Sequence, residues 1–230
     1  MPTVLLVRHG RTAANAAGVL AGRSAGVPLD DTGREQAEAL AARLTHLPLA
    51  AIVTSPLERC VETANAVATG RHGLTPTADE RLVECGYGDW TGRPINELRR
   101  TRLWRQVQSH PSAATFPGGE SMRAMQVRAV DAIREHDGRI AAQAGGSAAW
   151  VAVSHGDVIK AVVADALGMH LDAFQRIVVD PASVTVITYT DLRPFVVHLN
   201  HTGERLSVTP RKRRRRRSSD AEVGGGSGSE

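Results

Sequence analysis

Two segments of the chain place a histidine and a glycine directly after an apolar run. Residues 3–7 precede Arg8-His9-Gly10, and residues 150–154 precede His155-Gly156. Unbroken apolar runs are typical of parallel strands covered on both faces, and ligands bind such sheets at the carboxyl ends of the strands. A neutral imidazole there can attack an anionic group while an adjacent guanidinium offsets the charge and a glycine lets the backbone come close. Either histidine alone could be structural, but two such units favour a site.

A third segment offers another cation. Ser55-Pro56-Leu57-Glu58 follows a short apolar run over residues 49–54 and has the pattern of a capping box with proline at the first helical position. We therefore expect a helix that starts at Ser55 and ends near residue 68. Arg59 then lies in its first turn, at the same sheet edge as His9 if the two strands are parallel neighbours. A solvated arginine on the helix surface is the equal alternative.

A carboxyl group follows in residues 81–92. This segment has too many glycines for a helix and too many bulky residues for a disordered linker, which predicts an ordered loop over a site. Glu84 is its only glutamate. From composition alone, Glu84 could also be an ordinary surface carboxylate.

The remaining pattern is that of an α/β protein. Thr32 with Glu35 three residues later predicts a capped helix that starts at Thr32. Apolar spacing predicts helices over residues 120–144 and 158–167 and a polar helix or pair of turns from residue 95 to about 108. An antiparallel hairpin over residues 184–190 and 195–200 is expected at the sheet edge.

Charge is unevenly spread along the chain. The net charge is +4, yet residues 1–210 hold 21 basic and 21 acidic side chains, so the excess comes from the arginine-rich run 211–217. We expect one folded domain over residues 1–208 and a disordered basic, then Gly/Ser-rich tail over residues 209–230 that could bind polyanions non-specifically. Two cysteines give no disulfide framework, and neither a leader pattern nor an 18-residue apolar run is present. The expected location is the cytoplasm, away from membranes.

Two histidines, two arginines and a carboxyl group suit a dianionic phosphoryl group, because phosphoryl transfer needs positioning and charge neutralisation. The ordered motifs resemble the histidine phosphatase (phosphoglycerate mutase-like) superfamily. The motifs that carry the resemblance are Arg8-His9-Gly10 with Thr12 and Asn15, Ser55 to Arg59 with Thr63-Ala64, Leu82-x-Glu84 with Gly88 to Gly92, Pro117 to Ser121, and Ser154-His155-Gly156.

The resemblance implies a three-layer αβα sandwich whose mostly parallel central sheet has an antiparallel edge. It also implies roles for individual residues: His9 is the nucleophile that becomes phosphohistidine, and Glu84 protonates the leaving oxygen and then activates water. The other residues implied to bind the phosphoryl group are Arg8, Asn15, Arg59, His155 and Gly156, with His155 also counted as catalytic. Neither a metal nor another cofactor is implied, and His198-x-x-His201 is a weak metal pattern for a terminal strand.

One departure from the family concerns Leu20-Ala21, where many members carry a polar side chain near the glycine numbered Gly22 here. The function expected is a metal-independent phosphomonoesterase for a small phosphorylated metabolite. A phosphoglycerate-type mutase and a non-catalytic phosphate- or polyanion-binding module are the alternatives. Substrate specificity is expected in residues 95–121, and the substrate itself and a homo-oligomeric state are left open.

Overall fold

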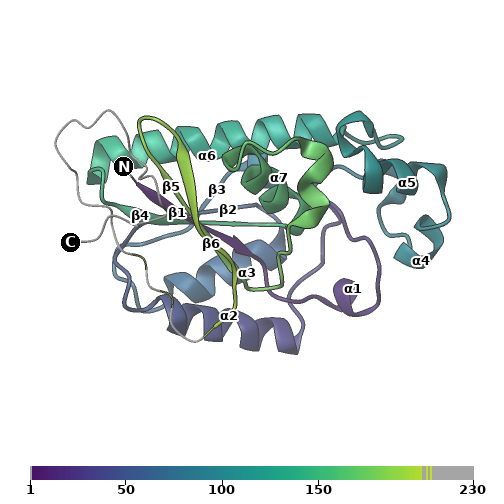
Figure 1. Cartoon of the computed structure of the whole chain (residues 1–230). Helices are drawn as coiled ribbons and strands as arrows, with labels where there is room; N and C mark the ends of the chain where they lie inside the picture. Colours follow the sequence, from purple (N-terminus) through teal and green to yellow (C-terminus); the bar gives the residue numbers. More distant parts are fainter. Residues whose placement is uncertain (1, 204–205, 207, 209–230) are drawn as a thin grey trace.

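The computed structural model describes residues 2–203, 206 and 208, so the expected tail over residues 209–230 lies outside the described residues. Its centre is a six-stranded sheet in the order β3-β2-β4-β1-β5-β6 (Figure 1). The strands are β1 (Thr3–Arg8), β2 (Leu49–Thr54), β3 (Thr77–Ala78), β4 (Ala149–Ser154), β5 (Val184–Tyr189) and β6 (Pro194–His201). The first four strands run parallel, while β5 is antiparallel to both β1 and β6. The mostly parallel sheet and its antiparallel edge hairpin are therefore confirmed.

Helices cover both faces of this sheet. The helices α2 (Asp31–Leu44) and α3 (Glu58–Ala68) lie on one face, and α6 (Met122–Ala144) and α7 (Gly156–Ala166) lie on the other (Figure 1). Alternate side chains of β1 pack against the two helix layers, because successive residues of a strand point to opposite faces. Val4 and Leu6 join the α6 and α7 side of the core, and Leu5 and Val7 join the α2 and α3 side. The sandwich of three layers follows from this double burial.

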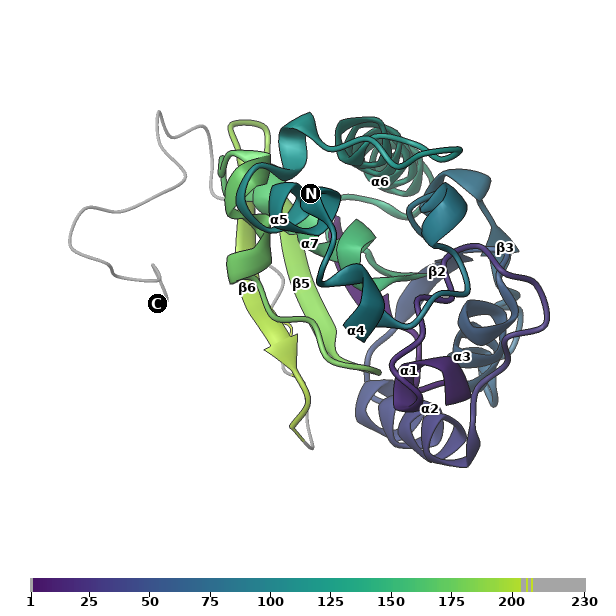
Figure 2. The ribbon, with the colours of Figure 1, turned by 90° about the vertical axis from the view of Figure 1, so that its right-hand side faces the viewer.

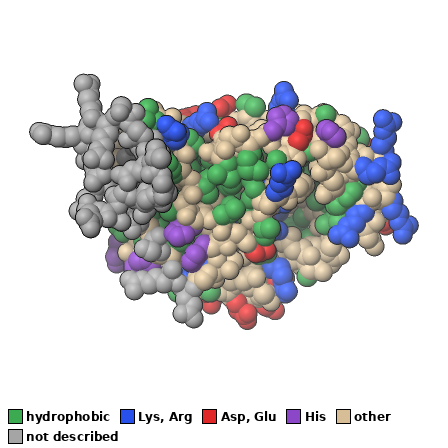
Figure 3. All heavy atoms as spheres, in the orientation of Figure 1, with side chains coloured by type: hydrophobic (Ala, Val, Ile, Leu, Met, Phe, Trp, Pro, Cys, Tyr) green, Lys and Arg blue, Asp and Glu red, His purple; other side chains and the backbone are tan. Residues whose placement is uncertain are grey.

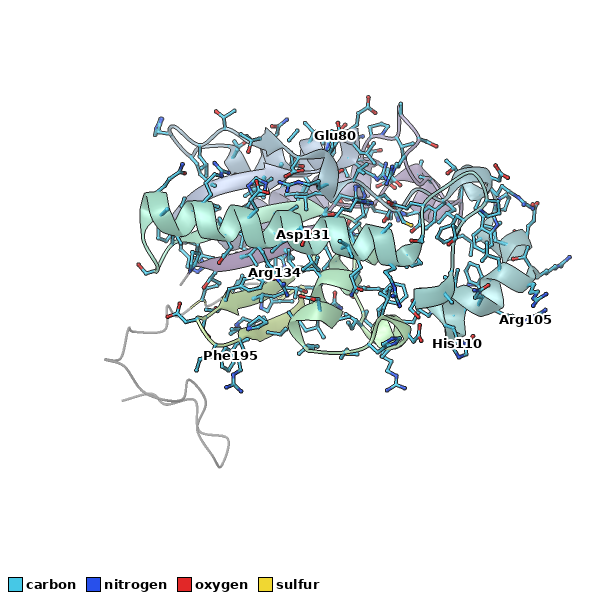
Figure 4. All side chains as sticks on the ribbon, turned by 90° about the horizontal axis from the view of Figure 1, so that it is seen from above. Glu80, Arg105, His110, Asp131, Arg134 and Phe195 are labelled. Atoms are coloured by element: carbon cyan, nitrogen blue, oxygen red, sulfur yellow. The ribbon has the colours of Figure 1, made fainter. Side chains whose placement is uncertain are left out.

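Short elements gather beyond the carboxyl ends of the parallel strands, at the end that faces the viewer in Figure 2. The region from residue 95 to about 108, predicted as a polar helix or pair of turns, forms two short helices, α4 (Ile95–Leu98) and α5 (Arg102–Ser109). The other elements are α1 (Ala13–Ala16) and the 3-10 turns η1 (Glu80–Leu82), η2 (Gly88–Trp90), η3 (Pro111–Ala113) and η4 (Leu171–Arg176). Basic side chains gather at this end of the molecule (Figure 3), and the segment with Arg105 and His110 projects beyond the sheet (Figure 4).

The predicted start of α2 is wrong by two residues. Asp30, not Thr32, is the N-cap, and its carboxylate accepts a hydrogen bond from the Gly33 N–H at 2.7 Å. The Thr32 hydroxyl instead accepts from Arg11 Nη2 at 2.9 Å. An ionised carboxylate interacts more favourably with the positive end of a helix than a hydroxyl does, which explains why Asp30 caps α2 in place of Thr32.

The predicted start of α3 is also wrong. The helix begins at Glu58 with Leu57 as N-cap, and no side chain caps it. The Ser55 hydroxyl is engaged elsewhere, at 2.8 Å from His155 Nε2. Serine is a common helix cap, but the Ser55 side chain instead contacts a residue far away in the sequence.

Two glycines let the loop after β1 pack against the first turn of α2. A Cβ atom on Gly10 would lie 2.4 Å from the Gly33 carbonyl oxygen, and one on Gly33 would lie 2.0 Å from the Arg11 carbonyl oxygen. Gly10 was expected to let the backbone approach a ligand. Its close contact is with the α2 backbone, which holds the His9 loop in place.

Replacing Gly33 by alanine is expected to lower the free energy of unfolding by about 1–3 kcal/mol, because the added Cβ overlaps the backbone of Arg11. Gly138→Ala is the matched control in α6, where a Cβ meets nothing within 4 Å. That control should raise the free energy of unfolding by about 0.4–1 kcal/mol. Urea unfolding of both variants measures the difference, and equal stability of the two would contradict the close packing of the His9 loop.

Candidate active site

The register of three strands builds the site. β4 lies between β1 and β2 and is parallel to both, so these two strands end at the same sheet edge although they are not adjacent. Just beyond the strands, the His9 N–H donates to the Ser154 carbonyl at 3.1 Å, and the Ser55 N–H donates to the Val153 carbonyl at 2.9 Å. The His9 and His155 rings consequently meet edge to face, with centroids 5.2 Å apart.

His9 is presented as a neutral nucleophile. Its side chain is buried, and Nδ1 lies 2.7 Å from the Gly10 carbonyl oxygen. A carbonyl can only accept, so Nδ1 carries the proton and Nε2 keeps its lone pair. Burial, and then the charges of Arg59 and Arg8, lower the pKa of His9 to about 3. The imidazole is therefore unprotonated throughout the neutral range.

Arg8 and Arg59 each have a buried N–H group that makes no hydrogen bond within the described part of the chain. Arg59 Nη2 donates to the Gly22 carbonyl at 2.7 Å, and Arg8 Nη1 donates to the Val179 carbonyl at 2.6 Å. Arg59 Nη1 and Arg8 Nε are buried without a hydrogen-bond partner in the part of the chain that the structure describes. An unsatisfied buried donor costs about 1–3 kcal/mol and more on a charged group, so these atoms favour an incoming anion.

The first turn of α7 adds a third source of positive potential. The helix begins at Gly156, and a Cβ on this residue would lie 3.6 Å from Arg8 Nε, so the guanidinium packs closely over the glycine. Helix N-termini attract anions through their free N–H groups. His155 precedes this turn and is fully buried, which lowers its pKa well below the usual value. Two guanidiniums and the start of α7 thus lie near His9, together with the neutral His155 ring.

Cys60 lies in the same wall, with Sγ 3.5 Å from His155 Nε2. Burial raises the pKa of this thiol far above its usual value. Because the thiolate is the reactive form of cysteine, Cys60 is a packing residue here and His9 remains the available nucleophile.

Glu84 has the properties of an acid. Burial, followed by the charge of Asp157, raises the pKa of its carboxyl to about 7, against the opposing effects of Arg59 and Arg8. Its Oε1 accepts a hydrogen bond from the Cys85 N–H at 2.9 Å. The same two guanidiniums act on His9 and on Glu84, so these two side chains lie within electrostatic reach of the same pair of cations.

A clamp that the sequence did not reveal holds the Glu84 loop. Arg23 Nε and Arg128 Nη2 donate to the Glu84 carbonyl oxygen at 2.8 and 3.1 Å. Both arginines also pair with Glu120 Oε1 at 2.7 Å, and the Gly86 N–H donates to the same oxygen at 2.8 Å. Glu120 belongs to one of the quoted motifs, but nothing in the sequence pairs it with residues about 100 and 8 positions away.

Asn15 and the segment before Gly22 differ from the other predicted site residues. Asn15 Oδ1 accepts from the Thr12 N–H at 3.1 Å and from the Thr12 hydroxyl at 3.0 Å, which completes the capping box of α1. These bonds tie Asn15 to its own helix, so its contribution to phosphate binding stays a prediction. The Gly22 carbonyl holds Arg59 through the backbone, so this contact does not require a polar side chain at Leu20 or Ala21.

No group of three or more metal-ligating side chains comes together within residues 2–203 and at positions 206 and 208. The His198 and His201 rings lie 5.8 Å apart. Over the same residues, none of the helices is both long and apolar enough to cross a membrane.

Comparisons with known proteins identify the family of the chain. Residues 4–202 match the model of the histidine phosphatase superfamily (branch 1). Phosphoserine phosphatase 1 of Hydrogenobacter thermophilus is 30% identical over 209 residues, which cover 89% of this chain and 96% of that protein. The probable phosphoglycerate mutase GpmB of Yersinia pestis is 33% identical over 193 residues, covering 83% and 86%. The structure of YhfR from Bacillus stearothermophilus superposes with a TM-score of 0.79 at 30% identity and covers 90% and 98% of the two chains.

Inorganic phosphate should stabilise the protein through the buried Nη1 donor of Arg59. At 100 times its Kd, a ligand adds about 2.7 kcal/mol to the free energy of unfolding, which corresponds to a Tm increase of roughly 5–10 °C for a chain of this size. We expect Arg59→Met to lose most of this increase, and Arg34→Met, a charge-matched control on the α2 surface, to keep it. A full increase in Arg59→Met would show that phosphate binds elsewhere.

Proposed function

The chain belongs to the histidine phosphatase superfamily, and we propose that it is a phosphomonoesterase that hydrolyses a small phosphorylated metabolite through a phosphohistidine intermediate. The observation that carries the proposal is the neutral His9 ring, whose Nε2 keeps its lone pair, together with the buried Arg59 and the partly buried Arg8, each of which has one buried N–H group without a partner among the described residues. This arrangement suits a phosphoryl dianion, because the cations neutralise the charge that would otherwise repel a nucleophile.

In the first half of the proposed reaction, His9 Nε2 attacks phosphorus. The N–P bond forms as the bond from phosphorus to the ester oxygen breaks, and Arg8, Arg59, His155 and the Gly156 N–H bind the phosphoryl oxygens. Glu84 gives its proton to the departing alkoxide oxygen. A carboxyl with a pKa of about 7 is suited to this step, since a large fraction is protonated near neutral pH.

In the second half, the ionised Glu84 takes a proton from water as that water attacks the phosphohistidine. The N–P bond breaks, His9 regains its lone pair, and phosphate leaves with the oxygen from water. Glu84 ends the cycle protonated, so atoms and protons balance. One group can act as acid and then base because it stays beside the same phosphorus atom in both steps.

The choice of hydrolysis over mutase transfer depends on access of water. A mutase must shield phosphohistidine from water until the acceptor returns, which requires a cover over the pocket. Here 24 residues (93–116) separate the Glu84 loop from the Pro117 motif, and they form only α4, α5 and η3. Trp104 stacks on Trp90 with ring centroids 6.2 Å apart, and Phe116 meets Trp90 at 5.2 Å. Stacking against the core favours a fixed rim over a closing lid.

The deciding experiment supplies 3-phosphoglycerate with a trace of 2,3-bisphosphoglycerate and follows both 2-phosphoglycerate and free phosphate, beside a panel of phosphorylated metabolites. We expect phosphate release from the best substrate to exceed isomerisation. His9→Ala is the blank and should lose at least about a hundredfold in turnover, because removing a nucleophile costs several orders of magnitude. Isomerisation that outpaces every phosphate release would assign the protein to the mutases.

Glu84→Gln should damage catalysis according to the leaving group. A nitrophenolate leaves with little protonation, whereas an alkoxide needs a proton. While phosphorylation of His9 limits the rate, we expect turnover of glycerol phosphate to fall at least about tenfold more than turnover of nitrophenyl phosphate. Single-turnover rates with the two esters test this role, and equal losses would remove Glu84 from proton transfer to the leaving group.

A further inference from the structure

One partly buried hydrogen bond links the loop of the proposed acid to the start of α7. The Tyr87 hydroxyl donates to Asp157 Oδ2 at 2.8 Å. Tyr87 follows Glu84 by three residues and is 5% exposed, and Asp157 follows His155 by two. Neither residue has a role in the reaction as derived above.

Asp157 occupies a place that favours a negative charge. It is the second residue of α7, in the first turn of the helix, where a carboxylate interacts favourably with the free N–H groups. Its other neighbour is Lys160, whose Nζ lies 4.0 Å from Oδ1. Burial, and then the charge of Asp157, raises the pKa of the Tyr87 hydroxyl well above its usual value, so this hydroxyl stays a donor.

Glu84 needs an anion nearby because cations dominate its surroundings. Arg59 on α3 and Arg8 on β1 favour its ionised form and so oppose its use as an acid. Arg23 and Arg128 bind its backbone carbonyl oxygen, and Glu120, which pairs with both, offsets half of their combined charge. Asp157 on α7 is the carboxylate that acts on Glu84 in the opposite direction to the two pocket arginines.

We propose that Asp157 is a positioning residue for proton transfer: held in place by the Tyr87 hydroxyl, its carboxylate keeps Glu84 in the acid form beside the two phosphate-binding arginines. Asp157 acts through Glu84 and needs no contact with the substrate. The assignment of proton transfer to Glu84 rests on the proposed function, whereas the electrostatic pairing of Asp157 with Glu84 does not.

The proposal has a definite direction. Glu84 is protonated below its pKa and loses the proton as the pH rises through it, so catalysis that needs this acid declines on the alkaline side. Neutralising Asp157 removes the charge that opposes ionisation. The Glu84 titration, and the alkaline limb that depends on it, should then move to lower pH.

The direct test is a ¹³C NMR titration of the glutamate carboxyl groups in the full-length protein, with Glu84→Gln to assign the signal. In Asp157→Asn, which keeps an acceptor for Tyr87, we expect the Glu84 midpoint to fall by about one pH unit. Asp157→Glu should restore most of the wild-type value. Asp165→Asn is the matched control, because Asp165 lies on the same helix and pairs at 2.7 Å with the α6 residue Arg134, labelled in Figure 4. An unmoved Glu84 midpoint in folded Asp157→Asn overturns the proposal.

The pH dependence of kcat/KM adds a readout that a purely structural role would not move. With glycerol phosphate, the alkaline limb of Asp157→Asn should shift by the same amount as the NMR midpoint, while the Asp165→Asn limb stays in place. If Asp157→Asn does not fold, Asp157→Ser removes the same charge with a residue suited to a helix start. A shifted midpoint in a protein without phosphatase activity would support the pairing and contradict the proposed function, so the two failures are distinguishable.

Discussion

The parallel alignment of β1, β4 and β2 is the constraint on which the site depends. Arg8 is in register with Ser154 and Thr54 with Val153, so the three strands end at one level. The backbone bonds that continue past these ends place His9, Ser55 and His155 side by side. A register slip of one residue would turn every side chain of a strand to the opposite face, which would disrupt both core layers and separate the catalytic groups. Core packing and site geometry are therefore secured by the same hydrogen bonds.

This arrangement costs free energy that the core must offset. Arg8 Nε and Arg59 Nη1 are buried without partners among the described residues, and burial beside arginines holds His9 and His155 neutral. Each unsatisfied donor opposes folding by about 1–3 kcal/mol. Full burial of Val4, Leu5, Leu6 and Val7 on the strand that carries Arg8 and His9 opposes that loss. The unsatisfied donor of Arg8 thus lies at the end of a strand whose apolar residues are fully buried.

Local patterns in the sequence predicted the elements, and long-range contacts decided the details. The two apolar runs before His9 and His155 predict β1 and β4 correctly. Each histidine directly follows its strand in the sequence, so its place at the sheet edge depends on local sequence alone. The helix starts at Thr32 and Ser55 were mispredicted, since both hydroxyls bond to residues distant in the chain, Arg11 and His155. No spacing rule indicated that β4 would lie between β1 and β2 or that Glu120 would join two arginines.

Burial acts on His9 and Glu84 in the same sense, because it favours the neutral form of each. The two arginines then separate them: their charge assists the neutral state of the imidazole and opposes that of the carboxyl. A site that binds a dianion needs these cations, so it cannot remove them to retain its acid. A compensating anion must act on the carboxyl without cancelling the cations at the phosphoryl pocket. Such an anion is best placed outside the ring of phosphate ligands, and the hydrogen bond from Tyr87 holds the proposed anion, Asp157, to the Glu84 loop.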